Sequence, residues 1–184
     1  EESLFRKQLI DHTRKYGEKR AIVLSGLAFG LFHMNLFQVF YAFLLGIMFG
    51  YVYTRTSKLR YSTAMHMIIN FNGGVLAPWV LTRVDLDQLE KVSEAAENGN
   101  TAAMTQWASQ NAAGLAIMVV YFLLYGAVIL AGFVLLIRNF RKAEFYIAPE
   151  ELPRGTGART VYSNVGMITF IVVTGLLTAI NLFL

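Results

Sequence analysis

Two histidines and an asparagine lie in strongly apolar surroundings in the first half of the chain. His33 follows Phe29 by four residues and His66 precedes Asn70 by four, so in a helix the members of each pair share one face. A polar side chain inside a bilayer costs about 2–4 kcal/mol on insertion scales. Residues kept there at such a cost are candidates for a functional site.

A carboxylate that could act with them is found at the start of the sequence. Glu1 and Glu2 form an acidic pair, and Arg6 follows Glu2 by four residues. A carboxylate, two imidazoles and an amide that converge in a low-dielectric cavity suit peptide hydrolysis. The carboxylate, with or without one imidazole, takes a proton from water, while the other imidazole and the amide donate hydrogen bonds to the developing oxyanion.

The composition indicates what kind of scaffold holds these residues. The chain is 55% hydrophobic and 15% charged, whereas soluble domains have about 25% charged residues, and its mean hydropathy is +0.48. We therefore expect an all-α, polytopic transmembrane helical bundle. The sequence contains no Cys, which excludes disulfides and thiolate chemistry. We expect apolar or amphipathic helices over residues 1–16, 21–34, 36–54, 61–82, 112–137 and 161–184.

Details of these segments predict how they pack and end. Two of them carry small-residue pairs, Gly26 with Gly30 and Gly46 with Gly50, which permit close approach of helix backbones. The segment 21–34 reaches only about 20 Å, short of the ~30 Å hydrocarbon core. Because Asn72, two glycines and Pro78 interrupt the segment 61–82, we expect a break or kink there.

Charge distribution predicts the orientation. Of the sixteen Lys and Arg residues, only Arg83 and Lys91 fall in the acidic stretch 83–110. We therefore place 83–110 outside as an extramembrane loop, with a short helix in its first half, and the basic loop 138–160 in the cytoplasm. Counted from the cytoplasmic turns, Glu1 and His33 then lie roughly 20 Å above the cytoplasmic face. His66 and Asn70 lie roughly 9–15 Å above it, and ordinary helix tilt lets all four converge near the membrane centre. This use of basic residues also argues against a nucleic-acid partner.

The order of the motifs resembles a known family. Glu1-Glu2-x-x-x-Arg6, Phe29-x-x-x-His33 and His66-x-x-x-Asn70 follow one another within seventy residues. They are similar to the three motifs of the CPBP family, the CAAX proteases and bacteriocin-processing, Abi-like enzymes that include the type II CAAX prenyl endopeptidases. The helices that precede the first motif in that family are missing, so we expect residues 1–184 to be a fragment, a single membrane domain without its N-terminal helices.

The resemblance implies an intramembrane glutamate-dependent endopeptidase without a metal cofactor. Glu1 is then the catalytic base, His33 helps to activate the water, and His66 with Asn70 forms the oxyanion site. Glu2, Arg6 and Phe29 are supporting residues. The implied substrate is a membrane-anchored peptide or protein, with a prenylated CAAX tail as one candidate. The implied location is a bacterial or archaeal cytoplasmic membrane, which the chain crosses several times. A membrane-protein partner is compatible with this location.

Several alternatives stay open from the residues. Zinc bound by Glu1, His33 and His66 is a minority alternative, and Ser62 lies four residues before His66, at the spacing of a Ser-His hydrolase. The histidines can also merely satisfy backbone carbonyls or relay protons in a transporter. Finally, a member of the same family can act as a non-proteolytic membrane scaffold or a bacteriocin-immunity protein.

Overall fold

The computed structural model describes residues 1–183, and helices joined by turns make up this part of the chain. This confirms the predicted all-α class. Within the described residues, the helical stretches that are long and apolar enough to cross a membrane are Leu36–Thr56, Leu59–Leu81, Ala112–Asn139 and Val165–Phe183. The protein is therefore an integral membrane protein. The chain divides into two compact units, Glu1–Met67 with the segment from Glu144 onward, and Ile68–Ala143.

The first unit contains the N-terminal helices and the C-terminal ones. Its elements are the π-helical turn η1 (Ser3–Gln8), α1 (Leu9–Thr13), the 3₁₀ turn η2 (Arg14–Tyr16), α2 (Glu18–Phe32), α3 (Leu36–Thr56), α4 (Leu59–Phe71, which ends in the second unit), α9 (Arg154–Tyr162) and α10 (Val165–Phe183). With 15 residues, α2 is too short to span the hydrocarbon core, as predicted.

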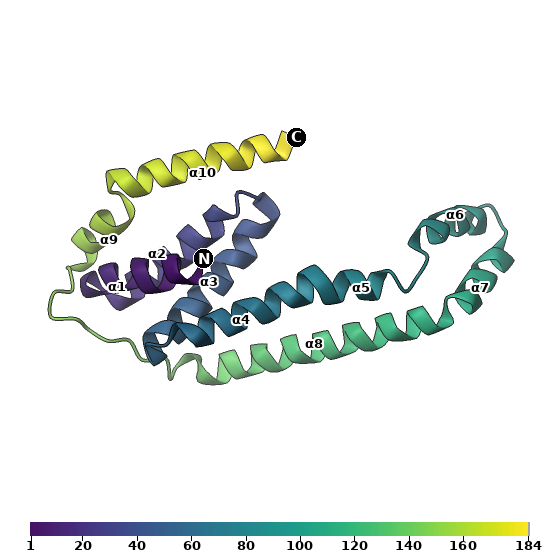
Figure 1. Ribbon diagram of the computed structural model, residues 1–184, viewed down its shortest axis with the longest axis horizontal. Coiled ribbons are helices and arrows are strands. Elements are labelled where there is room, and N and C mark those ends of the chain that lie inside the picture. Colours follow the sequence, from purple (N-terminus) through teal and green to yellow (C-terminus); the bar gives the residue numbers. More distant parts are fainter. Residues whose placement is uncertain (184) are drawn as a thin grey trace. The chain divides into compact units, whose positions relative to one another are not determined.

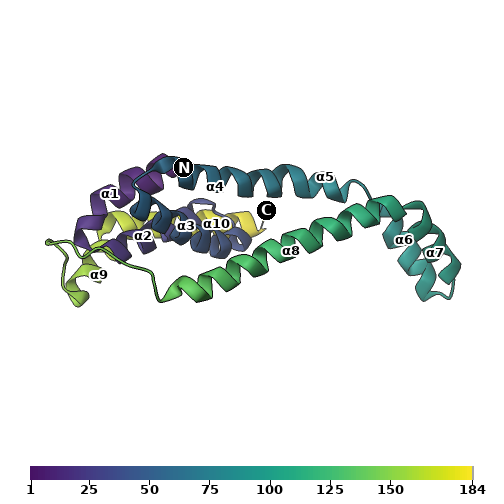
Figure 2. The same cartoon turned by 90° about the horizontal axis from the view of Figure 1, so that it is seen from below.

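Close packing of α2 against α3 forms the centre of this unit, and the two helices run side by side in both views (Figure 1, Figure 2). The glycine pairs from which close approach was predicted make this packing possible. A Cβ added at Gly46 would lie 2.8 Å from the Cα of Gly26, and one added at Gly30 would lie 2.8 Å from the backbone oxygen of Val39. Any larger side chain at these positions would push the helices apart.

The C-terminal segment packs on α2. Leu24 of α2 forms a buried cluster with Val161 of α9 and Met167 of α10. Arg20 donates to the backbone oxygen of Leu152 at 2.8 Å. The Tyr162 hydroxyl donates to the backbone oxygen of Arg20 at 3.1 Å, and burial raises the pKa of this tyrosine.

A buried carboxylate holds the start of α2 to its neighbours. Glu18 is 1% exposed and accepts hydrogen bonds from Arg14 at 2.9 Å, from Arg55 at the end of α3, and from the backbone N–H of Tyr146 at 3.2 Å. Two guanidinium groups and one amide thus compensate its burial. The contact fixes the end of α3 and the segment after residue 144 to one point of α2.

The second unit is built around the end of the third apolar segment and the long helix α8. Its elements are the π-helical turn η3 (Asn72–Leu76), α5 (Ala77–Leu81), α6 (Leu86–Glu97), α7 (Thr101–Gln110) and α8 (Ala112–Phe140). α6 is the short helix predicted in the acidic stretch. Its N-cap Asp85 accepts from the N–H of Gln88, and the indole of Trp107 in α7 donates to the Asp85 carbonyl at 3.0 Å.

The break or kink predicted near residues 72–78 takes another form. The helix continues from Leu59 to Leu81, and the irregularity is the π-helical turn η3, in which the N–H of Ala77 bonds the carbonyl of Asn72. Pro78 lies in the first turn of α5, where its missing N–H removes little hydrogen bonding. The wider π-helical turn therefore accommodates Pro78 without interrupting the helix.

Candidate active site

The acidic motif lies at the start of the π-helical turn η1, packed into the first unit. Arg6 is fully buried, and its Nη2 lies 3.2 Å from Oε1 of Glu2, one turn earlier. The guanidinium carbon also lies 4.4 Å from the centre of the Phe29 ring, a favourable cation–π distance. Glu2 is buried while Glu1 keeps a side chain that is 40% exposed. The two adjacent carboxylates therefore have different surroundings.

His66 of α4 lies between these two carboxylates. Its Nδ1 donates to Oε1 of Glu2 at 3.2 Å, and its Nε2 lies 3.6 Å from Oε2 of Glu1. The imidazole side chain is 13% exposed. A doubly protonated ring donates from both nitrogens, whereas the neutral ring with Nδ1–H keeps Nε2 as an acceptor toward Glu1. At 3.6 Å, the contact between Nε2 and Glu1 is within ion-pair distance but is not a hydrogen bond.

His33 ends α2 in a tight turn that Asn35 stabilises. The Asn35 side chain accepts from the N–H groups of Phe37 and Gln38 and caps α3, while Met34 has a positive φ of 49°. Nδ1 of His33 donates to the backbone oxygen of Phe29 at 2.8 Å. Because a carbonyl only accepts, Nδ1 carries the proton and Nε2 of the neutral ring is an acceptor.

Phe29 brings the separate motifs together. It is 2% exposed, and its ring centre lies 4.8 Å from that of His33 and 5.3 Å from that of His66, both edge-on. His66 also packs on Phe49 of α3, with ring centres 5.6 Å apart. Both imidazoles are thus held by aromatic packing. Within residues 1–183, no hydrogen bond or ion pair joins His33 to Glu1 or to His66, and the Phe29 ring is the contact that the two histidines share.

Asn70 lies one turn after His66 in α4, the spacing that the sequence predicted. It belongs to the second unit, which begins at Ile68. Asn70 is exposed. Its proposed role rests on its helical register with His66 and on the family motif.

Two buried serines make contacts that the sequence did not reveal. Ser62 is fully buried, and its hydroxyl donates to the carbonyl of Leu59 at 3.0 Å. The hydroxyl thus serves its own helix, and this does not support the Ser-His alternative. Ser25, also fully buried, donates to the carbonyl of Phe5 at 2.7 Å and accepts from Nη1 of Arg6 at 3.4 Å. The sequence signal for Ser25 was its spacing, four residues before Phe29 and eight before His33.

The zinc alternative requires three ligands around one point. Among the described residues, no group of three His, Asp or Glu side chains is arranged to hold a metal ion. Glu1 and His66 are neighbours, and His33 and His66 each contact the Phe29 ring. Zinc bound by Glu1, His33 and His66 stays an alternative that a chelation experiment tests.

The segment that contains these residues is similar to a known protein family. Residues 1–72 match the family of type II CAAX prenyl endopeptidase Rce1-like proteins. The match confirms the resemblance seen in the three motifs, and it contains every predicted site residue from Glu1 to Asn70. No curated protein and no solved structure matched the chain. Helices α5 to α10 lie outside the part matched to the Rce1-like family.

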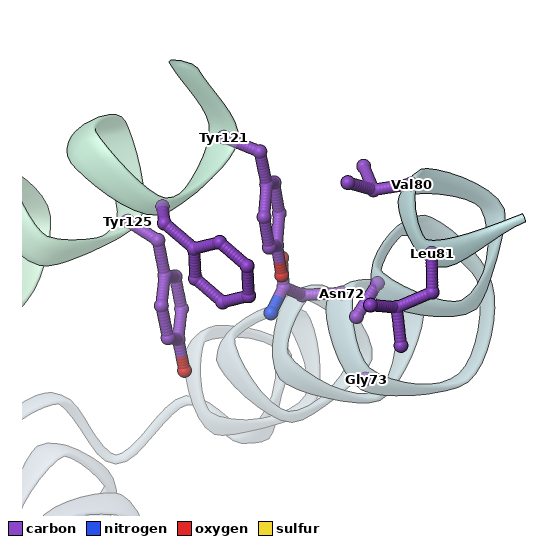
Figure 3. Close-up of a pocket in the computed structure, with 8 residues that line it drawn as sticks. Asn72, Gly73, Val80, Leu81, Tyr121 and Tyr125 are labelled. Carbon is purple, nitrogen blue, oxygen red and sulfur yellow. The ribbon is translucent and has the colours of Figure 1, made fainter. Parts of the chain in front are cut away.

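A separate pocket lies within the second unit. Its volume is about 290 Å³, and η3, α5 and α8 line it. Figure 3 shows the stacked rings of Tyr121 and Tyr125 facing Asn72, whose Oδ1 accepts from the Tyr121 hydroxyl at 3.2 Å. None of the predicted site residues lines this pocket.

Proposed function

We propose that this protein is an intramembrane endopeptidase that hydrolyses a peptide bond with a water activated by Glu1. The observation that carries the proposal is the convergence of the first and third motifs. Glu1 and Glu2, at the start of the chain, face the two ring nitrogens of His66, sixty-four residues or more away. The match of residues 1–72 to the Rce1-like family supports the same reaction class.

The side chains divide into two roles. Glu1, the more exposed of the two carboxylates, takes the proton of the attacking water, and His33, with Nε2 as an acceptor, orients that water. His66 in its doubly protonated form donates a hydrogen bond from Nε2 to the oxygen of the tetrahedral intermediate, and the amide of Asn70 donates a second one. Glu2, paired with Arg6, holds the imidazole of His66 at Nδ1. The proton taken by Glu1 is then returned to the amine that leaves.

The substrate in this proposal is a membrane-anchored peptide, and a prenylated CAAX tail is the first one to test. The site is built from helices of an integral membrane protein. Because α2 is too short to cross the hydrocarbon core, it does not close the site off from both membrane surfaces. An extended segment that is anchored by lipid or by its own transmembrane helix can be presented there. A folded soluble domain cannot enter between the helices.

The test uses the full-length protein in detergent or liposomes with three substrates. These are a prenylated CAAX peptide, the same peptide anchored by a transmembrane helix, and casein. Glu1→Gln is expected to lower the rate on anchored peptide by about 10²–10⁴-fold, and Asn70→Ala by about 10²–10³-fold. His12→Ala, a change at an exposed histidine of α1, is the matched control and is expected to keep wild-type activity.

Two results would contradict the proposal. Equal cleavage by wild type and by Glu1→Gln would remove the carboxylate from the mechanism. A membrane-inserted wild type that cleaves nothing, while its cellular activity survives Glu1→Gln and His33→Ala, would favour the non-proteolytic scaffold or immunity protein. Efficient digestion of casein without preference for anchored peptides would refute the substrate class alone.

A further inference from the structure

Ser25 connects the acidic motif to α2 through two successive residues. Its hydroxyl donates to the Phe5 carbonyl at 2.7 Å and accepts from Nη1 of Arg6 at 3.4 Å. One contact is to backbone and the other to side chain, and Ser25 is fully buried. A segment held at the backbone of one residue and at the side chain of the next is fixed in rotation about its own axis.

That rotation matters because Glu1 and Glu2 directly precede η1, and the N–H groups of Leu4 and Phe5 bond the Glu1 carbonyl. Arg6 lies one turn after Glu2, and the two side chains approach to 3.2 Å. The same oxygen of Glu2 accepts from Nδ1 of His66 at 3.2 Å. A continuous series of contacts therefore runs from Ser25 through Arg6 and Glu2 to His66. Each adjacent pair lies within 3.5 Å, so a shift at the first contact displaces the last.

We propose that Ser25 is a positioning residue that sets the rotation of η1 and thereby holds Glu1 and Glu2 against the imidazole of His66. This rests on the proposed function, in which Glu1 is the base. Ser25 touches neither substrate nor water in this mechanism and acts through Arg6 and the backbone of Phe5. Small errors in the placement of a general base reduce the chemical step more than substrate binding.

The structure offers a matched control for a purely structural role. Ser62 is equally buried, but its hydroxyl donates to a carbonyl of its own helix. Removal of either hydroxyl deletes one oxygen from a buried site and leaves one carbonyl without that donor. Only the change at Ser25 releases η1. A difference between the two variants therefore reports positioning and not general loss of buried hydrogen bonding.

The experiment measures kcat, KM and amide hydrogen exchange in the full-length protein for Ser25→Ala and Ser62→Ala. Ser25→Ala is expected to lower kcat on a membrane-anchored peptide at least tenfold, with KM changed less than twofold. Exchange of amides 3–9 is expected to rise at least tenfold. Ser62→Ala is expected to change all of these less than twofold. Ser25→Cys, close in size with a weaker donor, is expected to lower kcat at least threefold.

The outcomes separate this inference from the proposed function. If the wild type cleaves no anchored peptide, the proposed function fails, and the exchange of amides 3–9 still decides whether Ser25 anchors η1. If the wild type cleaves and Ser25→Ala keeps kcat within twofold of Ser62→Ala, the positioning role is refuted. A fall in kcat with unchanged exchange at amides 3–9 also refutes it. If Ser25→Ala does not fold, Ser25→Cys decides by the same two measurements.

Discussion

The buried pair of Glu2 and Arg6 allows the placement of the acidic motif to be tested by stability alone. The perturbation is Arg6→Met, which keeps much of the side-chain volume and removes the charge. Arg6 is fully buried and the Glu2 side chain is 8% exposed. The variant therefore leaves a carboxylate largely out of contact with water, with His66 as its remaining polar neighbour.

The expected magnitude follows from the distances. Unit charges 3.2 Å apart attract by about 5 kcal/mol at an effective dielectric constant of 20. Removal of one partner of a buried pair typically costs about 3–5 kcal/mol, and loss of the cation–π contact with Phe29 adds about 1–2 kcal/mol. Among the described residues, Nε and Nη2 of Arg6 lack hydrogen-bond partners. The total destabilisation should therefore lie at the lower end of the sum of these two ranges. We expect a loss of about 4 kcal/mol.

The assay is reversible unfolding in mixed detergent micelles, compared across a double-mutant cycle. Glu2→Gln is expected to destabilise by about 3 kcal/mol because it leaves the guanidinium buried without its counter-ion. The double variant Glu2→Gln/Arg6→Met removes both charges, so its loss should be smaller than the sum of the single losses by at least about 2 kcal/mol. Additive losses, or a loss below about 1 kcal/mol for Arg6→Met, would show that the pair is not buried as described.

Three further predictions concern packing, topology and metal. Gly46→Ala places a Cβ 2.8 Å from the Cα of Gly26 and should destabilise by about 1–3 kcal/mol in the same unfolding assay, whereas Gly126→Ala, with nothing within 4 Å, should be close to neutral. Labelling with an impermeant thiol reagent should reach a cysteine introduced at Asn98 from the outside of sealed vesicles, and labelling from the cytoplasmic side would reverse the proposed orientation. Chelator and added zinc should each change the cleavage rate less than twofold, and a loss restored by zinc would instead indicate a metalloprotease.

Local sequence information was sufficient to predict the all-α membrane class, and it also indicated which residues to propose for the site. Apolar segments of spanning length and spacings of four depend on neighbours within one helix. The structure has helices at these places, with His33 as the C-cap that directly follows α2. Gly26 and Gly46 also predicted close packing of two helices, because the absence of a side chain is a property of each position. The site roles assigned from the motifs remain proposals.

Tertiary structure decided which of these residues meet. Glu1 and Glu2 are adjacent in sequence, yet one remains partly exposed and the other is buried between Arg6 and His66. Ser25 binds the backbone of η1, a contact that its position in the sequence does not predict. The segment with the glycines before Pro78 forms a π-helical turn instead of a break. Such contacts depend on the crossing point and axial rotation of helices far apart in the chain. Helical periodicity determines which residues lie on the same face of one helix, but not which face of another helix they pack against.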